Sequence, residues 1–211
     1  LVRLRSSTLS LWRTNTPDNV FSTHIRVDSR NTKWINSSTS IFAFDDTSWK
    51  TIPINSTYIS DQLVIDSRDR KWVCGMGGKD KGIVCIDGDT FNFYNEADGL
   101  PFSQYLSIRC YLDPFDTKWF YSTDNGVVRY DNSAWKHFKT TDGLFNDPIN
   151  CMVVDSDHVA WFAGNRGISS FDDVKWTTYS DGDKLPLLSV NRIIADSKGT
   201  KWAVASSNLV R

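Results

Sequence analysis

The sequence predicts an all-β protein folded as a five-bladed β-propeller with four-stranded antiparallel blades. Three observations support this: a unit of about 42 residues recurs five times, each unit holds short apolar runs, and turn-forming residues separate the runs. Repeats of roughly 40 to 50 residues with four strands each are typical of propeller blades. No stretch shows the apolar spacing of an amphipathic helix over three turns.

The repeat is defined by an Asp that is followed six residues later by a Trp. The five pairs are Asp28 and Trp34, Asp66 and Trp72, Asp113 and Trp119, Asp155 and Trp161, and Asp196 and Trp202. A second aromatic series alternates with the first: Trp12, Trp49, Phe91, Trp135 and Trp176. We expect the Asp to accept hydrogen bonds from backbone N–H groups of its own turn, and the Trp to fill the wedge between blades.

The third unit shows how one blade is built. Its apolar runs predict strands over 108–112, 118–121, 127–130 and 135–138. Asp, Asn, Gly and Ser lie between these runs, so the connections are expected to be tight turns. Four strands joined in this way form an antiparallel meander.

Length and composition predict a single domain that covers residues 1–211. Lys and Arg number 24 against 25 Asp and Glu, which gives a net charge of −1, and no polybasic run is present. Nucleic acid is therefore not expected as a partner. No apolar run is long enough for a membrane-spanning helix, so no membrane segment is expected in this chain.

The two ends of the chain resemble parts of one blade. Residues 1–14 are similar to the last two strands of a unit, and residues 190–211 are similar to the strands that precede them. We expect the terminal blade to be shared by 1–14 and 190–211, which would close the ring and hide two sheet edges. The alternative is an arc of a larger propeller that needs further blades or a second chain.

The four cysteines are expected to be buried free thiols. Cys74, Cys85, Cys110 and Cys151 lie among alternating apolar residues and show no spacing typical of a zinc site. A disulfide between Cys74 and Cys85 across one hairpin is the alternative. No metal and no cofactor are expected.

Several segments resemble the two-component regulator propeller repeat. They are 196–202 (Asp-Ser-Lys-Gly-Thr-Lys-Trp), 126–131 (Gly-Val-Val-Arg-Tyr-Asp), 141–144 (Thr-Asp-Gly-Leu) and 98–101 (Asp-Gly-Leu-Pro). The resemblance covers essentially the whole chain. It implies a propeller from a periplasmic or cell-envelope protein, of the kind found in sensors of bacterial hybrid two-component systems, which often recognise oligosaccharides.

The best candidate site is a ring of residues that lie four positions before each repeat Asp. His24, Gln62, Arg109 and Arg192 occupy this position in four units, and Cys151 occupies it in the other. Because strands align on the Asp, these side chains are expected to face one mouth of the central channel. Loops beside the mouth could add contacts. The candidates there are Tyr58, Phe102, Tyr105, Lys79, Asn125 and Arg166.

The function predicted from the sequence is binding rather than catalysis. The three His residues fall at different places in the repeat, and no paired carboxylates lie at the predicted mouth, so an enzyme is not expected. Aromatic rings beside Arg and Asn suit an oligosaccharide or another small polar ligand. A protein-interaction scaffold, or an architectural segment of a larger protein, is the alternative; solvated channel residues without a ligand are the simplest interpretation of the ring.

Overall fold

The computed structural model describes residues 2–5, 8–11, 24–37, 40–54, 58–76, 82–100, 108–122, 126–146, 148–165, 167–180, 189–205 and 208–211. These residues form six antiparallel sheets and two short 3₁₀ helices. The smallest sheet is an N-terminal hairpin of two strands, and the other five follow the sequence repeat. We call those five the first to fifth sheet, in chain order.

The strand bounds agree closely with the repeat. The N-terminal hairpin has β1 (Val2–Arg5) and β2 (Thr8–Leu11). The first sheet has β3 (Ile25–Val27), β4 (Lys33–Asn36), β5 (Ser40–Phe44) and β6 (Trp49–Pro53). The second has β7 (Tyr58–Ile65), β8 (Lys71–Met76), β9 (Gly82–Asp87) and β10 (Thr90–Tyr94).

The remaining sheets repeat the same meander. The third has β11 (Arg109–Leu112), β12 (Lys118–Tyr121), β13 (Val127–Tyr130) and β14 (Trp135–Phe138). The fourth has β15 (Ile149–Val154), β16 (Ala160–Gly164), β17 (Ile168–Phe171) and β18 (Trp176–Tyr179). The fifth has β19 (Val190–Ala195), β20 (Lys201–Ala205) and β21 (Asn208–Val210). The four strands predicted for the third unit are thus confirmed.

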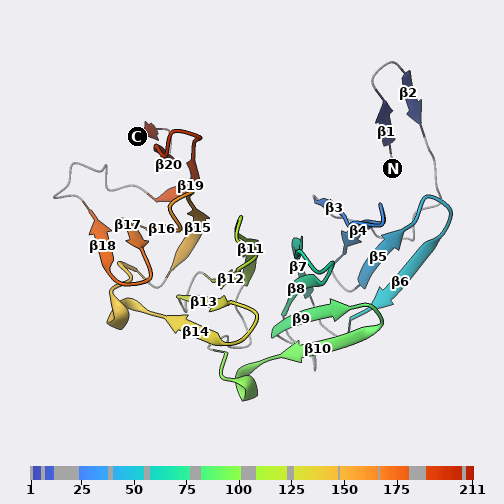
Figure 1. The fold of residues 1–211 in the computed structure, drawn as a ribbon, viewed down its shortest axis with the longest axis horizontal. Helices are drawn as coiled ribbons and strands as arrows, with labels where there is room; N and C mark the ends of the chain where they lie inside the picture. The colour runs from blue at the N-terminus through green and yellow to red at the C-terminus, as the bar shows by residue number, and fades with distance from the viewer. Residues whose placement is uncertain are drawn as a thin grey trace.

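The five sheets follow one another around an arc (Figure 1). The first strand of each sheet lies on the concave side of the arc, and the outer strands β6, β10, β14 and β18 lie on its convex side. The first and fifth sheets stand on opposite sides of the opening. Each sheet therefore packs face to face with its neighbours in the sequence, as blades of a propeller do.

The prediction of five complete blades closed by the chain ends is corrected by this arrangement. Four sheets have four strands, but the fifth has three, and β1 and β2 pair with each other instead of with β21. The hairpin forms because its two strands are close in sequence, whereas a shared blade of 1–14 with 190–211 would have to bridge the opening of the arc (Figure 1). The all-β propeller architecture is confirmed; the closed five-blade ring is not.

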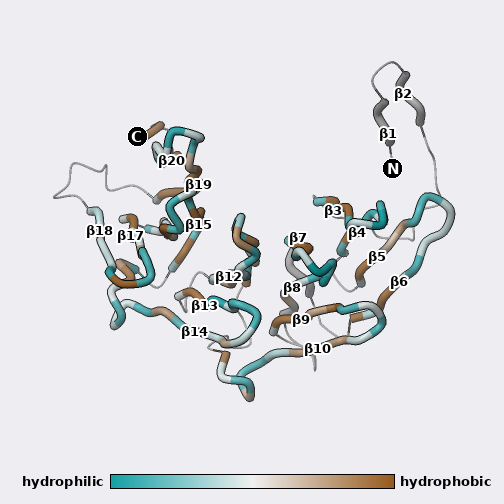
Figure 2. Tube along the Cα trace, viewed as in Figure 1, coloured by the Kyte–Doolittle hydropathy of each residue, from teal (hydrophilic) through white to brown (hydrophobic). Residues whose placement is uncertain are grey.

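The core is divided among the four interfaces between consecutive sheets. One apolar cluster fills each interface, and each contains residues from both adjoining sheets. Trp72, which is fully buried, packs between the second and third sheets with Phe120 and Val128. Figure 2 shows an apolar stretch along β9, which is buried on both faces, and hydrophilic residues in many of the turns. Four of the five repeat Trp residues fill these wedges, as predicted; Trp202, on the fifth sheet, does not.

The repeat Asp organises each turn between the first and second strands. In the second sheet, Asp66 Oδ1 accepts hydrogen bonds from the N–H groups of Arg68 (3.0 Å) and Arg70 (2.9 Å). Its other oxygen, Oδ2, accepts the indole N–H of Trp72 at 2.9 Å. The same three bonds recur at Asp28, Asp113, Asp155 and Asp196. The predicted turn role is confirmed, and the bond to the Trp fixes the ring in the interface.

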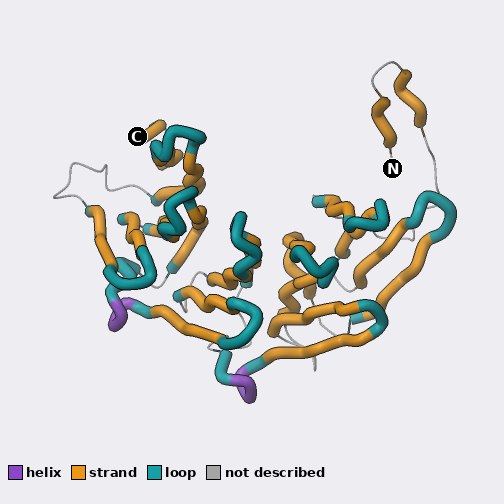
Figure 3. Tube along the Cα trace, in the orientation of Figure 1, coloured by secondary structure: helices purple, strands orange, loops and turns teal. Residues whose placement is uncertain are grey.

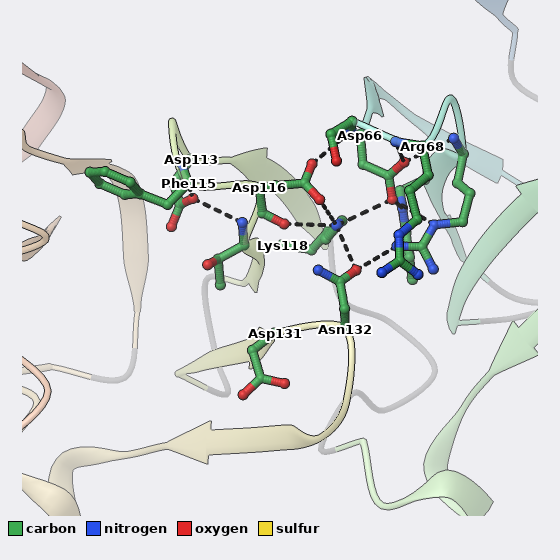
Figure 4. Close-up of polar contacts among 12 residues, drawn as sticks. Asp66, Arg68, Asp113, Phe115, Asp116, Lys118, Asp131 and Asn132 are labelled. Carbon is green, nitrogen blue, oxygen red and sulfur yellow. Dashed lines mark hydrogen bonds and ion pairs between the residues drawn. The ribbon is translucent and has the colours of Figure 1, made fainter.

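A lysine from the following sheet completes this arrangement. Lys118 Nζ lies 3.2 Å from Asp66 Oδ2 and 5.9 Å from the centroid of the Trp72 ring. Its remaining bonds go to Asp116 Oδ2 (2.9 Å), the Asp116 carbonyl (2.7 Å) and Asn132 Oδ1 (2.8 Å) (Figure 4). Neither the Lys118 nor the Asp66 side chain is exposed. We call this arrangement the Asp–Trp–Lys clasp.

The clasp occurs at three of the four interfaces. Lys71 pairs with Asp28 at 3.2 Å and Lys201 with Asp155 at 2.6 Å, each over the Trp ring of the earlier sheet. At the interface between the third and fourth sheets, Ala160 takes the lysine position. There Arg129 of the third sheet lies over its own Trp119 ring and pairs with Asp173 of the fourth.

The two Asp-Gly-Leu segments form the short helices shown in purple in Figure 3. In the helix Thr140–Asp142, Asp142 Oδ2 accepts the Lys139 N–H at 2.8 Å, and Gly143 follows with a φ of 118°. A side chain at Gly143 would meet the Trp176 ring at 2.7 Å, and Leu144 is buried. The helix Glu96–Asp98 has the same cap, with Asp98 Oδ2 accepting the Asn95 N–H at 2.8 Å and Gly99 at a φ of 87°. The motif is therefore a structural connection between sheets.

Among the described residues, no helix has the length and apolarity of a membrane span.

We predict that Trp72→Ala lowers the free energy of unfolding much more than Trp202→Ala. Both variants remove the same bond to an Asp, but Trp72 is fully buried between two sheets and Trp202 is only half-buried on the fifth. The expected losses are about 3 to 5 kcal/mol for Trp72 and about 1 to 2 kcal/mol for Trp202. Urea unfolding of the two variants measures the difference, and equal losses would contradict this packing.

We also predict that acid weakens the fold through the repeat Asp residues. Burial alone would raise the pKa of Asp66, but hydrogen bonds from Trp72 and Arg70 and the charge of Lys118 outweigh it and leave the pKa below its ordinary value of 3.8. A pKa that is lower in the folded state contributes stability above the unfolded value, and this stability is lost as pH falls through the folded value. The free energy of unfolding should therefore fall below about pH 4. Asp66→Asn should be less stable at neutral pH and less sensitive to acid; an unchanged acid slope would argue against this assignment.

Candidate functional site

The concave side of the arc holds a cavity of about 640 Å³. Residues from the first strand of every sheet line it, together with Tyr121 of β12. The Asp turn fixes the end of each first strand. Residues at the same position in each repeat therefore lie at a similar level along the cavity wall. The cavity is therefore built by the repeat and given its chemistry by the side chains that differ between copies.

The structure brings the predicted ring together in this cavity. The residues four positions before the repeat Asp all line it: His24, Gln62, Arg109, Cys151 and Arg192. This placement follows from the common register of the inner strands. Whether these side chains bind a ligand stays a prediction.

The ionisable side chains of the cavity wall favour a negative ligand. Arg26, Arg109 and Arg192 line it with His24, and no Asp or Glu occurs among the described lining residues. Arg109 donates to the Asn150 carbonyl at 2.6 Å, which holds its guanidinium against the wall. Arg192 is exposed, and no hydrogen-bond or ion-pair partner for it occurs in the described part of the chain. Its donors can therefore reach a ligand.

Two polar residues of the wall have structural contacts. Gln62 Oε1 accepts the backbone N–H of Cys110 at 3.1 Å and so joins the second sheet to the third. Asn150 Nδ2 donates to the Val190 carbonyl at 3.2 Å and joins the fourth sheet to the fifth. Gln62 of the ring and Asn150 beside it thus stabilise the contacts between blades as well as lining the cavity.

Apolar side chains line the rest of the cavity. They come from the same inner strands and include Val64, Leu112, Met152, Val153 and Ile194. A cavity with guanidinium groups beside an apolar wall suits a ligand that has both anionic groups and carbon faces.

Cys85 and Cys151 are poor nucleophiles among the four cysteines. All four are free, which confirms the expected thiols, and the alternative disulfide between Cys74 and Cys85 is not formed. Burial raises the pKa of Cys85 to about 12 and that of Cys151 to about 11, although Arg109 and Arg192 act in the opposite direction on Cys151. Because the thiolate is the reactive form, Cys151 lines the cavity as a weakly polar, protonated group.

The predicted loop contacts cannot be placed. Lys79, Phe102, Tyr105, Asn125 and Arg166 lie outside the described residues, and so does the side chain of Tyr58, whose backbone begins β7. No group of three or more His, Cys, Asp or Glu side chains that could hold a metal ion occurs among the residues that are described.

Sequence reasoning missed Arg26 and Tyr121 as cavity residues. Arg26 lies two positions before its Asp, where the other sheets have Val64, Tyr111, Val153 and Ile194. A charged residue in place of an apolar one was therefore a visible signal. Tyr121 carried no such signal, because it is in the second strand and reaches the cavity as the cross-strand partner of Arg109. Burial raises its pKa to about 12, against the opposing charge of Arg109.

No protein-family model and no curated protein matches the chain. Its fold is similar to several solved structures. The extracellular domain of a protein assigned to a hybrid two component system of B. thetaiotaomicron is 20% identical, with a TM-score of 0.67 over 88% of this chain and 27% of that one. Virginiamycin B lyase from Staphylococcus aureus is 18% identical, with a TM-score of 0.65 over 86% and 62%. YCF48 bound to D1 peptide is 11% identical, with a TM-score of 0.64 over 96% and 67%.

These similarities show the fold. The chain has the propeller architecture of an extracellular two-component sensor domain, as the repeat resemblance implied, and it spans about a quarter of that relative and less than two thirds of the lyase.

The expectation that this chain is not an enzyme is corrected. Virginiamycin B lyase is an enzyme with the same fold, so scattered His residues and unpaired carboxylates in a propeller do not exclude catalysis.

Proposed function

We propose that the concave cavity binds a small anionic ligand, with an acidic oligosaccharide as the expected class. The observation that carries this proposal is the convergence of three arginines and a histidine on a cavity whose described wall has no carboxylate. Arginine donors pair with carboxylates or sulfates through charge-assisted hydrogen bonds, and apolar side chains beside them can contact the C–H faces of sugar rings. A volume of about 640 Å³ is enough for a ligand of two or three sugar rings.

The setting proposed for this binding is an extracellular or cell-envelope sensor or lectin-like protein. The resemblance of the repeats and the fold shared with an extracellular sensor domain support it. In such a setting, the cavity would recognise the ligand, and neighbouring parts of the protein would use the binding energy.

A protein-binding scaffold is the second candidate. The observation that favours it is the fold shared with YCF48, which was solved with a bound D1 peptide. An acidic peptide would meet the same arginines, so the two candidates share one cavity and differ in the backbone of the ligand.

We predict that Arg192→Ala weakens the binding of an oligogalacturonate by about 10-fold to 100-fold, the loss expected for one charge-assisted hydrogen bond. Isothermal titration calorimetry measures the affinity, with a neutral malto-oligosaccharide of equal length as the second ligand. The matched control is Arg68→Ala, because Arg68 is also exposed but lies outside the cavity.

Equal affinity of the two variants would contradict the proposed site. Equal affinity for neutral and acidic sugars would contradict the charge argument. If an acidic peptide binds with the same dependence on Arg192 and the sugars do not bind, the scaffold is the better description.

A further inference from the structure

The Asp–Trp–Lys clasp has a fixed direction along the chain. In each of its three copies the Asp and Trp belong to the earlier sheet and the Lys to the later one. Trp72 packs toward the third sheet, and Lys71, its neighbour in the same strand, points to the opposite face and toward the first. Every sheet thus has an Asp–Trp face toward the next sheet and an opposite face toward the previous one.

The fifth sheet presents an Asp–Trp face that no later sheet covers. Asp196 Oδ2 accepts the Trp202 indole N–H at 2.9 Å, as in the other sheets. On the same face Leu209 is 68% exposed and Val204 is 41% exposed. The residues that correspond to Leu209 in the four earlier sheets are at most 8% exposed: Ile41, Ile83, Val127 and Ile168.

The opposite face of the first sheet, which carries Lys33, is already covered over most of its area. Ile35, Phe42 and Phe44 share this face with Lys33 and are at most 4% exposed. Only its inner edge is open, where Ile25 is 50% exposed. This face therefore does not offer a docking surface for a whole blade.

We propose that the uncovered face of the fifth sheet is a docking surface for another four-stranded blade of the same Asp–Trp repeat. The docked blade would supply a lysine to Asp196 and the Trp202 ring. The first sheet stands on the other side of the opening and does not cover this face (Figure 1).

The register of the fifth sheet shows how to test this. Ala203 pairs with Val210, so Arg211 falls opposite Trp202, as Cys85 falls opposite Trp72 in the second sheet. A second copy of residues 86–146 joined after Arg211 would therefore continue β21 in register. It would add the missing fourth strand and then one complete blade that carries Lys118. The readout is hydroxyl-radical labelling of Leu209, followed by mass spectrometry.

The proposal expects labelling of Leu209 to fall about fivefold or more in the extended chain, in proportion to the lost exposed area. A matched extension that carries Lys118→Ala in the added copy, as in the natural fourth repeat, should protect Leu209 less. Unchanged labelling would overturn the proposal. So would an added copy that stays unfolded, judged by strong labelling of its own Phe120, because a competent face should order its blade.

The chain without the extension is labelled at several concentrations to identify other occupants. Strong labelling of Leu209 at high dilution is expected. Protection that increases with concentration would support the proposal and identify a second copy as the source of the blade. Protection that persists at high dilution would overturn it, since another part of the chain would then cover the face.

Discussion

The buried contact between a lysine of one sheet and an aspartate of the previous sheet is the constraint on which the arrangement of the blades depends. Lys118 and Asp66 have no exposed side-chain surface, so each charge is compensated only inside the protein. A buried charge without a partner costs several kcal/mol, roughly 3 to 5 when one partner is removed. Two apolar sheet faces could slide past each other at little cost. Two faces joined by the clasp cannot, because a shift of one residue would leave both charges unpaired.

The clasp also places the candidate site. The Asp at the end of each inner strand is held by its turn and by the Trp, and in the first, second and fourth sheets also by the lysine, which fixes the register of that strand against its neighbours. Four residues earlier, on the same strand, stand the side chains of the cavity wall, among them Arg109 and Arg192. The Asp and Trp that pack the sheets recur in every copy. The residues that differ between copies face the cavity. The repeat therefore keeps the packing constant while the cavity positions can vary in chemistry.

Much of this could be predicted from the sequence, because the periodic residues are also those that make local contacts. The turn Asp, the wedge Trp and the strands of the third unit depend on neighbours within about ten residues, and the structure has them where the repeat predicts. The ring of cavity residues followed from the common register. The clasp was not predicted, although Lys precedes Trp in four of the five repeats, because the Asp that the Lys binds lies in another unit.

Closure of the ring was predicted wrongly for a similar reason. The likeness of 1–14 and 190–211 to blade strands carries no information about the distance between the two segments. The charge of Arg26 was visible in the sequence, whereas the contribution of Tyr121 depends on its pairing with Arg109 across two strands.

A double-mutant cycle on Asp66 and Lys118 tests the dependence of the fold on the clasp. The free energy of unfolding is measured in urea for the wild type, Asp66→Asn, Lys118→Met and the double variant. If the clasp holds the second and third sheets together, each single variant is strongly destabilised, and the double variant loses less than the sum of the two by about 1 to 3 kcal/mol. Additive losses would show that the two charges act independently, and the sheets would then be held by apolar packing alone.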